Sequence, residues 1–196
     1  MNELVPGTVL TELALATELA SSQGAVREAL LRLEGEGLVS RNGRQGTVVT
    51  PLDRQTAEEI LDLRRRIETR AAHRVAHGAG TGDIAGLQRL FEQMQQDAAD
   101  NDGWALIETD TNFHLCLFRL SGLLAMEPIL ARCILHTHRF RLWAPWHRRP
   151  LAQTAARHAP IIAALEARNG DALARTLADH LDTIVETNIR TKEGSR

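Results

Sequence analysis

Residues 15–49, LATELASSQGAVREALLRLEGEGLVSRNGRQGTVV, decide the N-terminal part of the fold. An apolar pattern over residues 15–19 predicts a short helix, which breaks at residues 21–22. Ser22 is a suitable N-cap for a second helix, because its side chain can accept a hydrogen bond from the first turn. One face of that second helix would carry Val26, Ala29, Leu30 and Leu33.

After this helix the pattern changes from helical to strand-like. Gly35 and Gly37 end the helix, and two β-type runs at residues 38–40 and 47–49 flank a polar turn that contains glycine. Helix, turn, helix and a two-stranded wing is the layout of a winged helix-turn-helix DNA-binding module. An amphipathic helical hairpin that serves only packing is the alternative interpretation.

Several residues at fixed spacing carry a family resemblance. Residues 25–39 read A-V-R-E-A-L-x-R-L-x-x-E-G-L-V, and residues 44–49 read R-x-G-x-x-V. Together they resemble the DNA-reading head of GntR-type bacterial transcription regulators. Pro6, Gly7 and Leu10 match the P-G-x-x-L motif that precedes the first strand in that family.

The resemblance implies a set of DNA contacts in the second helix and the wing. Relatives usually carry S-R-x-P-V-R at the start of this helix, whereas this chain has Gln23 in place of the first Arg. Gln can pair with adenine but cannot fork onto guanine, so the operator should differ from the common one. For Arg27 the alternative is a salt bridge with Glu28 or Glu34. The predicted DNA-binding residues are Gln23, Gly24, Arg27, Arg41, Arg44 and Gly46.

The charge and length of this segment argue against strong DNA affinity. Residues 1–52 contain four Arg and six Glu, hence a net charge of −2, although non-specific affinity comes from neutralising phosphates. A dimer would double the sparse basic surface. Relatives carry a further helix before the P-G turn, and only five residues precede it here. We therefore expect the first helix of the head to be missing or truncated, because of a start codon placed too late.

Composition limits the class of protein. The chain has 196 residues, of which 43% are hydrophobic, and its net charge is −2. It has no run of roughly 18 apolar residues that could span a membrane, and no charged-then-apolar signal segment opens it. Cys116 and Cys133 lie in apolar helical patterns, which favours reduced thiols of a cytoplasmic protein over a redox pair.

Beyond the wing the pattern is helical throughout. The first helix would carry its apolar stripe on Ile60, Leu63, Ile67, Ala71 and Val75. Glycine-containing breaks separate the helices, which are expected at residues 56–78, 84–100, 104–120, 126–143, 151–168 and 171–190. The sequence thus predicts a mainly α fold with a winged helix-turn-helix domain at residues 1–52. An antiparallel all-α bundle of about six helices would follow at residues 53–196.

Polar residues interrupt the apolar faces of three bundle helices. Asp110 and His114 are four residues apart and share one face, while His158 and His180 lie on the apolar faces of two later helices. Burying such groups without partners costs several kcal/mol. Convergence on one divalent cation would satisfy all four, and Zn²⁺, Ni²⁺ or another first-row metal would suit these ligands. A hydrogen-bonded core is the alternative.

The motifs around these residues resemble the FCD ligand-binding domain of the FadR subgroup of GntR regulators. Residues 110–114 read D-x-x-F-H, residues 158–171 read H-x-x-I-x-x-A-L-x-x-x-x-G-D, and H-L follows at 180–181. The resemblance implies that Asp110, His114, His158 and His180 are metal ligands. It also implies a small carboxylate or sugar acid as effector, with Arg64, Arg139 and Arg141 as candidate contacts and His136 and His138 as further ones.

These expectations combine into one leading hypothesis and two rivals. The leading one is a ligand-responsive transcription regulator, a repressor that binds a pseudo-palindromic operator as a homodimer and is not an enzyme. The first rival is a metal-dependent hydrolase on an all-α scaffold, although no additional Glu or His stands out as its general base. The second is a regulator with an impaired DNA-binding head, which Gln23, the acidic head and the short N-terminus favour.

Overall fold

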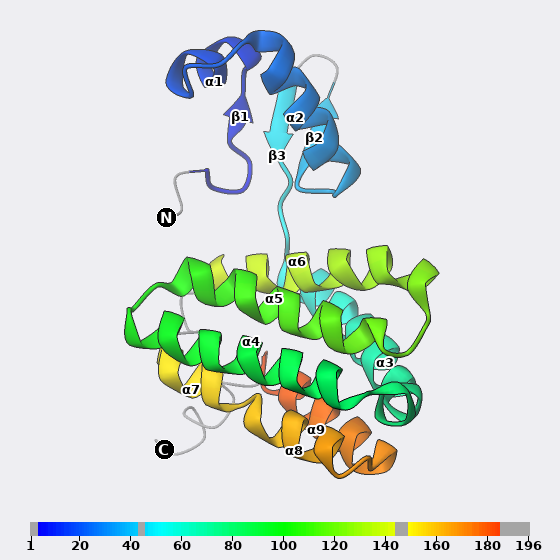
Figure 1. Ribbon diagram of the computed structural model, residues 1–196. Coiled ribbons are helices and arrows are strands. Elements are labelled where there is room, and N and C mark those ends of the chain that lie inside the picture. Colours follow the sequence, from blue (N-terminus) through cyan, green and yellow to red (C-terminus); the bar gives the residue numbers. More distant parts are fainter. Residues whose placement is uncertain (1–3, 43–45, 144–148, 185–196) are drawn as a thin grey trace, which may run out of the picture. The chain divides into compact units, whose positions relative to one another are not determined.

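The computed structural model describes residues 4–42, 46–143 and 149–184 (Figure 1). The chain divides into two compact units, Met1–Arg54 and Gln55–Arg196. None of the helices in the described ranges is long and apolar enough to cross a membrane.

The first unit is a small winged helix-turn-helix fold. Its elements are β1 (Val9–Leu10), α1 (Glu12–Glu18), α2 (Gln23–Gly35), β2 (Val39–Asn42) and β3 (Gly46–Val49). The three strands form one antiparallel sheet in the order β1-β3-β2. Thr11 and Ser22 cap the two helices through side-chain oxygens, as Ser22 was expected to do. The winged helix-turn-helix prediction is confirmed.

A small apolar core holds the two helices against this sheet. It contains at least one residue from every element of the unit: Leu10, Ala16, Val26, Leu30, Val39 and Val49, with Leu15 packed beside it. Gly37 makes the change of direction between α2 and β2, because its φ of 75° lies in the left-handed region that favours glycine. The turn that leads into the wing therefore follows from local sequence.

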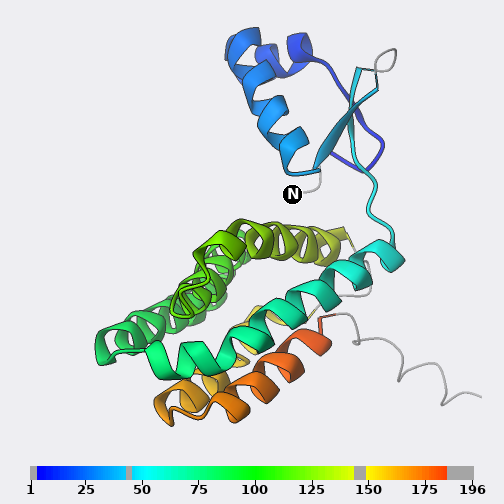
Figure 2. The same cartoon turned by 90° about the vertical axis from the view of Figure 1, so that its right-hand side faces the viewer.

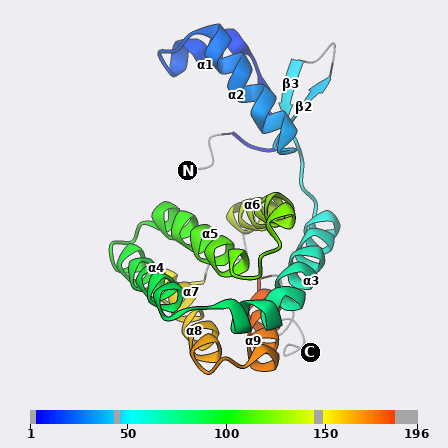
Figure 3. The same cartoon turned by 45° about the vertical axis from the view of Figure 1, so that its right-hand side comes forward.

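The second unit is a bundle of helices around one interior, which Figure 3 shows from near their ends. Its described helices are α3 (Arg54–Gly78), α4 (Thr81–Ala99), α5 (Gly103–Arg119), the short 3₁₀ helix η1 (Leu124–Met126), α6 (Glu127–Trp143), α7 (Leu151–Ala156), α8 (Ala159–Glu166) and α9 (Gly170–Asp182). One large apolar cluster, from Ile67 to Leu177, fills the interior. The mainly α prediction is confirmed.

The first and last helices of the bundle run antiparallel side by side (Figure 2). Arg65 of α3 pairs with Asp182 of α9 at 2.9 Å, and His73 contacts Asp171 at 3.0 Å. Leu61 packs on Leu181 between the two helices. Both polar contacts are substantially exposed, so the apolar contact contributes more to this pairing than they do.

The single helix expected at residues 151–168 is wrong, because two helices occupy this range. α7 ends at Ala156, and His158 forms the N-cap of α8. Pro160 explains the break, since it lacks an N–H and its ring would clash with the preceding turn of a continuous helix. At the start of a new helix Pro160 is tolerated, and His158 is turned inward at the junction.

The buried face of α3 also differs from the expected apolar stripe. Leu63 is 46% exposed, whereas Arg64 and Glu68 are almost fully buried beside Ile67. The predicted stripe contained only apolar residues, because charged side chains usually lie on the solvent face of a helix. Here Arg64 and Glu68 form an ion pair, which allows both to be buried.

Gly78 provides a test of how closely the helices pack. A Cβ added at Gly78 would lie 2.7 Å from the backbone carbonyl oxygen of Leu120, so that Gly78→Ala forces the ends of α3 and α5 apart. We expect a loss of about 1–3 kcal/mol in the free energy of unfolding, measured by urea denaturation. Gly82→Ala is the control, because its Cβ would meet nothing within 4 Å. Equal stability of the two variants would contradict this packing.

Candidate functional site

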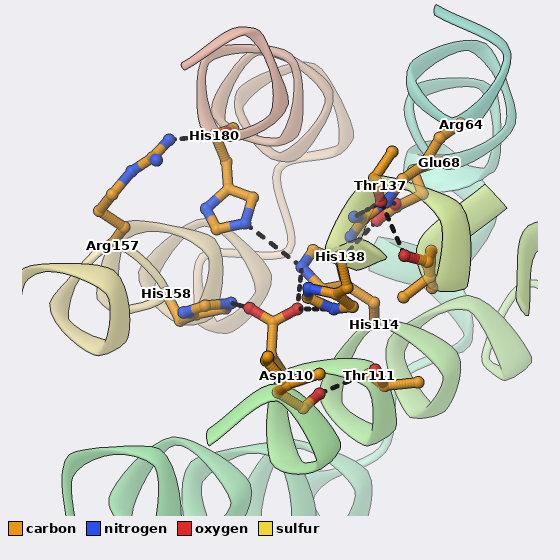
Figure 4. Close-up of polar contacts among 12 residues, drawn as sticks. Arg64, Glu68, Asp110, Thr111, His114, Thr137, His138, Arg157, His158 and His180 are labelled. Atoms are coloured by element: carbon orange, nitrogen blue, oxygen red, sulfur yellow. Dashed lines mark hydrogen bonds and ion pairs between the residues drawn. The ribbon is translucent and has the colours of Figure 1, made fainter. Parts of the chain in front are cut away.

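The four polar residues singled out in the bundle sequence meet in its interior (Figure 4). Asp110 and His114 come from successive turns of α5, His158 from the junction before α8, and His180 from the last turn of α9. All four are buried, and one potential ligand atom from each lies within 4.8 Å of the others. The structure thus brings together residues that are up to 70 positions apart in the chain.

The separations between these donor atoms suit a metal ion. His114 Nε2 lies 3.3 Å from His180 Nε2, and Asp110 Oδ1 lies 3.1 Å from His158 Nε2. Two donors bound to one zinc-like ion at 2.0–2.1 Å in a tetrahedral arrangement are about 3.3 Å apart. The second oxygen of Asp110, Oδ2, is 3.9 Å from His114 Nε2.

A buried ring nitrogen without a hydrogen-bond partner also favours a metal site. His158 Nε2 has no hydrogen-bond partner, because its 3.1 Å contact with Asp110 lacks the alignment of a hydrogen bond. The other ring nitrogen of His158, Nδ1, does bond, to the carbonyl oxygen of Ala155 at 3.1 Å. A neutral imidazole that donates through Nδ1 presents a free lone pair at Nε2, as a metal ligand must.

Two members of the cluster, Asp110 and His180, have the protonation state that metal binding requires. Burial raises the pKa of Asp110, but the imidazoles of His138 and His158 hold it well below its usual range, so the carboxylate is ionised. Burial, with the nearby His158 and His114, holds the pKa of His180 well below its usual range. At neutral pH His180 is therefore uncharged and would not have to lose a charge-carrying proton to bind an ion.

A second carboxylate, Glu68 of α3, orients His114 through the ring nitrogen that is turned away from the cluster. Glu68 Oε2 contacts His114 Nδ1 at 2.6 Å, which leaves Nε2 of that ring facing the centre. Arg64 donates to Glu68 at 2.7 Å and to the hydroxyl of Thr137 on α6 at 3.0 Å. Burial raises the pKa of Glu68, but His114 and Arg64 together lower it to about 2. Such carboxylate–histidine pairs are typical supports of metal ligands.

The sequence analysis did not identify Glu68 as part of this site. A signal was present, because Arg64 and Glu68 are four residues apart on a helix and can pair on its inward face. His138 also reaches the centre, with its Nε2 3.1 Å from Asp110 Oδ2. It had been considered only as an effector contact, and nothing in its local spacing links it to Asp110.

The three Arg residues predicted to bind an effector occupy different environments. Arg64 is 1% exposed and engaged with Glu68 and Thr137, although its Nη2 has no hydrogen-bond partner. Arg139 is half-buried, and burial lowers its pKa. Burial also lowers the pKa of Arg141, which is close enough to the Asp110 carboxylate for the two charges to interact. Of the three, Arg141 is best placed to meet a ligand at the centre.

Two further Arg residues gather beside His180. Arg157 donates to the backbone carbonyl oxygen of His180, and Arg149 donates to that of Thr183 at 3.1 Å. Burial, with the charges of Arg149 and Arg141, lowers the pKa of Arg157 to about 10. The end of α9 therefore carries positive charge, which complements the helix dipole and would favour an anionic ligand.

In the N-terminal unit, Gln23 and Gly24 are exposed in the first turn of α2, where base contacts are made in this fold. Arg27 is exposed too, but it forms a bidentate ion pair with Glu12 of α1, whose shortest contact is 2.7 Å. The alternative partners Glu28 and Glu34 are wrong: Glu28 pairs with Arg32, and Glu34 pairs with Arg41.

The wing residues are only partly within the described structure. Arg41 lies in β2 and is restrained by Glu34 at 3.4 Å. Gly46 begins β3 with a φ of 79°, a conformation that a side chain would strain. Arg44 lies outside the described residues. A DNA contact of any of these residues remains a prediction.

Comparison with known proteins agrees with this arrangement. Residues 1–49 match the model of the bacterial regulatory proteins of the gntR family, and residues 59–183 match the FCD domain. The chain is 30% identical over 178 residues to the Nta operon transcriptional regulator of Aminobacter aminovorans, covering 90% of this chain and 82% of that protein. It is 25% identical over 184 residues to the transcriptional repressor RspR of Escherichia coli, covering 94% and 81%.

Solved structures show the same fold. E. coli McbR/YncC superposes with a TM-score of 0.77 at 25% identity, over 92% of this chain and 86% of that one. The family matches together cover both units, and the first curated relative reaches 30% identity across most of its own length. The chain is therefore a transcriptional regulator of the GntR family that carries an FCD domain.

Proposed function

We propose that this regulator is a metal-dependent repressor whose helical unit senses a small organic or sugar acid. The observation that carries the proposal is the buried cluster of Asp110, His114, His158 and His180, in which the donor atoms have a spacing that suits a metal site. Zn²⁺ or Ni²⁺ fits three imidazoles and one carboxylate. The bound ion would act as a Lewis acid that attracts an oxygen of the effector.

The charges around the centre support an acidic effector. Arg141 interacts with Asp110, and Arg149 and Arg157 gather at the adjacent end of α9. A carboxylate can bind a metal through one oxygen while a guanidinium takes another. Both carboxylates of the centre, Asp110 and Glu68, are already held by imidazole or guanidinium groups, which favours a binding site over a hydrolase.

A homodimer in the cytoplasm completes the proposal. Large apolar residues are exposed on α3 and α6, among them Leu63 and Ile129. Both line a groove of about 350 Å³ between the two helices, together with Ile60, Pro128 and Cys133 among others. Such a face suits a second copy of the chain, which would present two recognition helices to a pseudo-palindromic operator. Repression is the activity that the name of RspR gives to that relative.

Metal content tests the centre directly. We expect about one Zn²⁺ or Ni²⁺ per wild-type chain and a large loss in His158→Ala and His180→Ala, because each variant removes one of four converging donors. Elemental analysis after dialysis measures this. At a free metal concentration of 100 times Kd, binding should stabilise the fold by about 2.7 kcal/mol. His77→Ala, on an exposed part of α3, should keep the metal. Equal metal content in all variants would reject the site.

Effector binding should depend on Arg141 separately from the metal. Calorimetric titration of the metal-loaded protein with small organic and sugar acids should identify a binder. Arg141→Leu should weaken that binder roughly ten-fold or more, since a hydrogen bond to a charged group contributes about 1.5–3 kcal/mol. Arg132→Leu is the control on the same helix, because Arg132 lines the α3/α6 groove instead. An unchanged affinity in Arg141→Leu would exclude it as the anchor.

The Arg27–Glu12 pair predicts a gain in DNA affinity on mutation. Glu12→Gln releases the Arg27 guanidinium for a phosphate, so we expect tighter binding and a plot of log K against log salt that is steeper by about one unit. Fluorescence anisotropy with duplex DNA measures both. Glu18→Gln removes the same charge from the same helix and controls for net charge. If the two variants behave alike, the ion pair does not restrain Arg27.

A further inference from the structure

His138 reaches the proposed metal centre from α6, a helix that supplies none of the four predicted ligands. It is 5% exposed, and its Nε2 lies 3.1 Å from Asp110 Oδ2. This contact mirrors the one that His158 makes with Asp110 Oδ1, also at 3.1 Å. Neither Nε2 atom has an aligned hydrogen bond. The two oxygens of one buried carboxylate are thus approached by two imidazoles from different helices (Figure 4).

The position of His138 differs from that of a ligand. The donor atoms that lie within 4.8 Å of one another belong to Asp110, His114, His158 and His180, and His138 is not among them. Its neighbour at the centre is Oδ2 of Asp110, the oxygen that also lies 3.9 Å from His114 Nε2. An imidazole in this place can bond to the carboxylate while Oδ1, on the side of His158, stays available to an ion.

We propose that His138 is a positioning residue of the metal centre: its Nε2, 3.1 Å from Oδ2 of Asp110, would donate to that oxygen once an ion binds Oδ1. This inference rests on the metal site proposed above. Ligating carboxylates are commonly held in this way by a hydrogen bond from outside the ligand set. A carboxylate that binds through one oxygen occupies one coordination position, so a further position stays open for an acidic effector.

The adjacent residue on α6 supports this role for the helix. Thr137 Oγ1 accepts a hydrogen bond from Arg64 Nη1 at 3.0 Å, and Arg64 in turn holds Glu68 against His114. Two consecutive buried residues of α6 thus serve the two carboxylates of the centre, Thr137 through Arg64 and His138 directly. His136, by contrast, lines the groove between α3 and α6.

The test uses the full-length chain loaded with Co²⁺, whose absorption spectrum reports the ligands around the ion. The variants are His138→Leu, which removes the donor, His138→Gln, whose amide nitrogen falls near the position of Nε2, and His138→Asn, whose amide is too short to reach Asp110. His136→Leu is the matched control on the same helix. Circular dichroism and the melting temperature of the metal-free proteins establish that each variant is folded.

We expect His138→Leu and His138→Asn to raise the Kd for Co²⁺ by about 10–100-fold and to shift the spectrum. His138→Gln should restore both properties toward those of the wild type, and His136→Leu should change neither. If His138→Leu does not fold, the comparison of Gln with Asn decides the outcome, because both are polar and only one reaches the carboxylate.

Three results would overturn the inference. If the Co²⁺ affinity and the spectrum are unchanged in His138→Leu and His138→Asn, His138 has no role in the metal centre. If His138→Gln does not restore the Co²⁺ affinity and the spectrum that His138→Asn loses, the hydrogen bond to Asp110 is rejected. X-ray absorption that counts one imidazole fewer in His138→Leu than in the wild type would make His138 a ligand. A wild-type chain that binds no Co²⁺ would instead overturn the metal site itself.

Discussion

Two ionised carboxylates in the interior of a helical bundle set the constraint on which this structure depends. Asp110 and Glu68 are 4% and 3% exposed, and an unpaired buried charge would destabilise the fold by several kcal/mol. Each therefore lies against basic side chains: His138 and His158 for Asp110, and Arg64 with His114 for Glu68. These partners come from α3, α5, α6 and the start of α8. Placing them correctly requires almost the whole bundle to assemble in one arrangement.

This constraint also bears on the metal site that we propose in the bundle. An uncharged His180 and an ionised Asp110, both fixed in the interior, would bind an ion without a change of their protonation. The supporting groups extend to α3, the helix that begins at Arg54, shortly after the last strand of the DNA-binding unit ends at Val49. A ligand that shifts His114 acts on Glu68 and hence on α3. Coupling to DNA still requires that the ligand bind two states of the protein with different affinity.

In the DNA-binding unit the paired charges are exposed instead of buried. Its exposed Arg27 is neutralised by Glu12 and its Arg41 by Glu34, so that little free positive charge remains on the described part of the head. Exposed pairs of this kind add little to stability. They do compete with phosphates for the same guanidinium groups. Acidic residues of the head, whose excess was noted from the sequence, thus form specific ion pairs with its Arg residues.

The sequence by itself determined the elements and the family. Helical and strand periodicities, glycine breaks and N-caps such as Ser22 act within a few residues, so the positions of most helices and of the wing could be read locally. Fixed motif spacing also indicated the GntR head, the FCD domain and the four residues that meet in the bundle.

Only the tertiary structure decided which of these residues touch. Glu12 reaches Arg27 over 15 positions, and Glu68 reaches His114 over 46. His138 meets Asp110 from another helix. Such pairs depend on how helices are rotated and packed against each other, and local periodicity carries no information about that. For the same reason the apolar stripe predicted for α3 did not include Arg64 and Glu68: these charged side chains are stable inside because they pair with each other and with Thr137 and His114 of other helices.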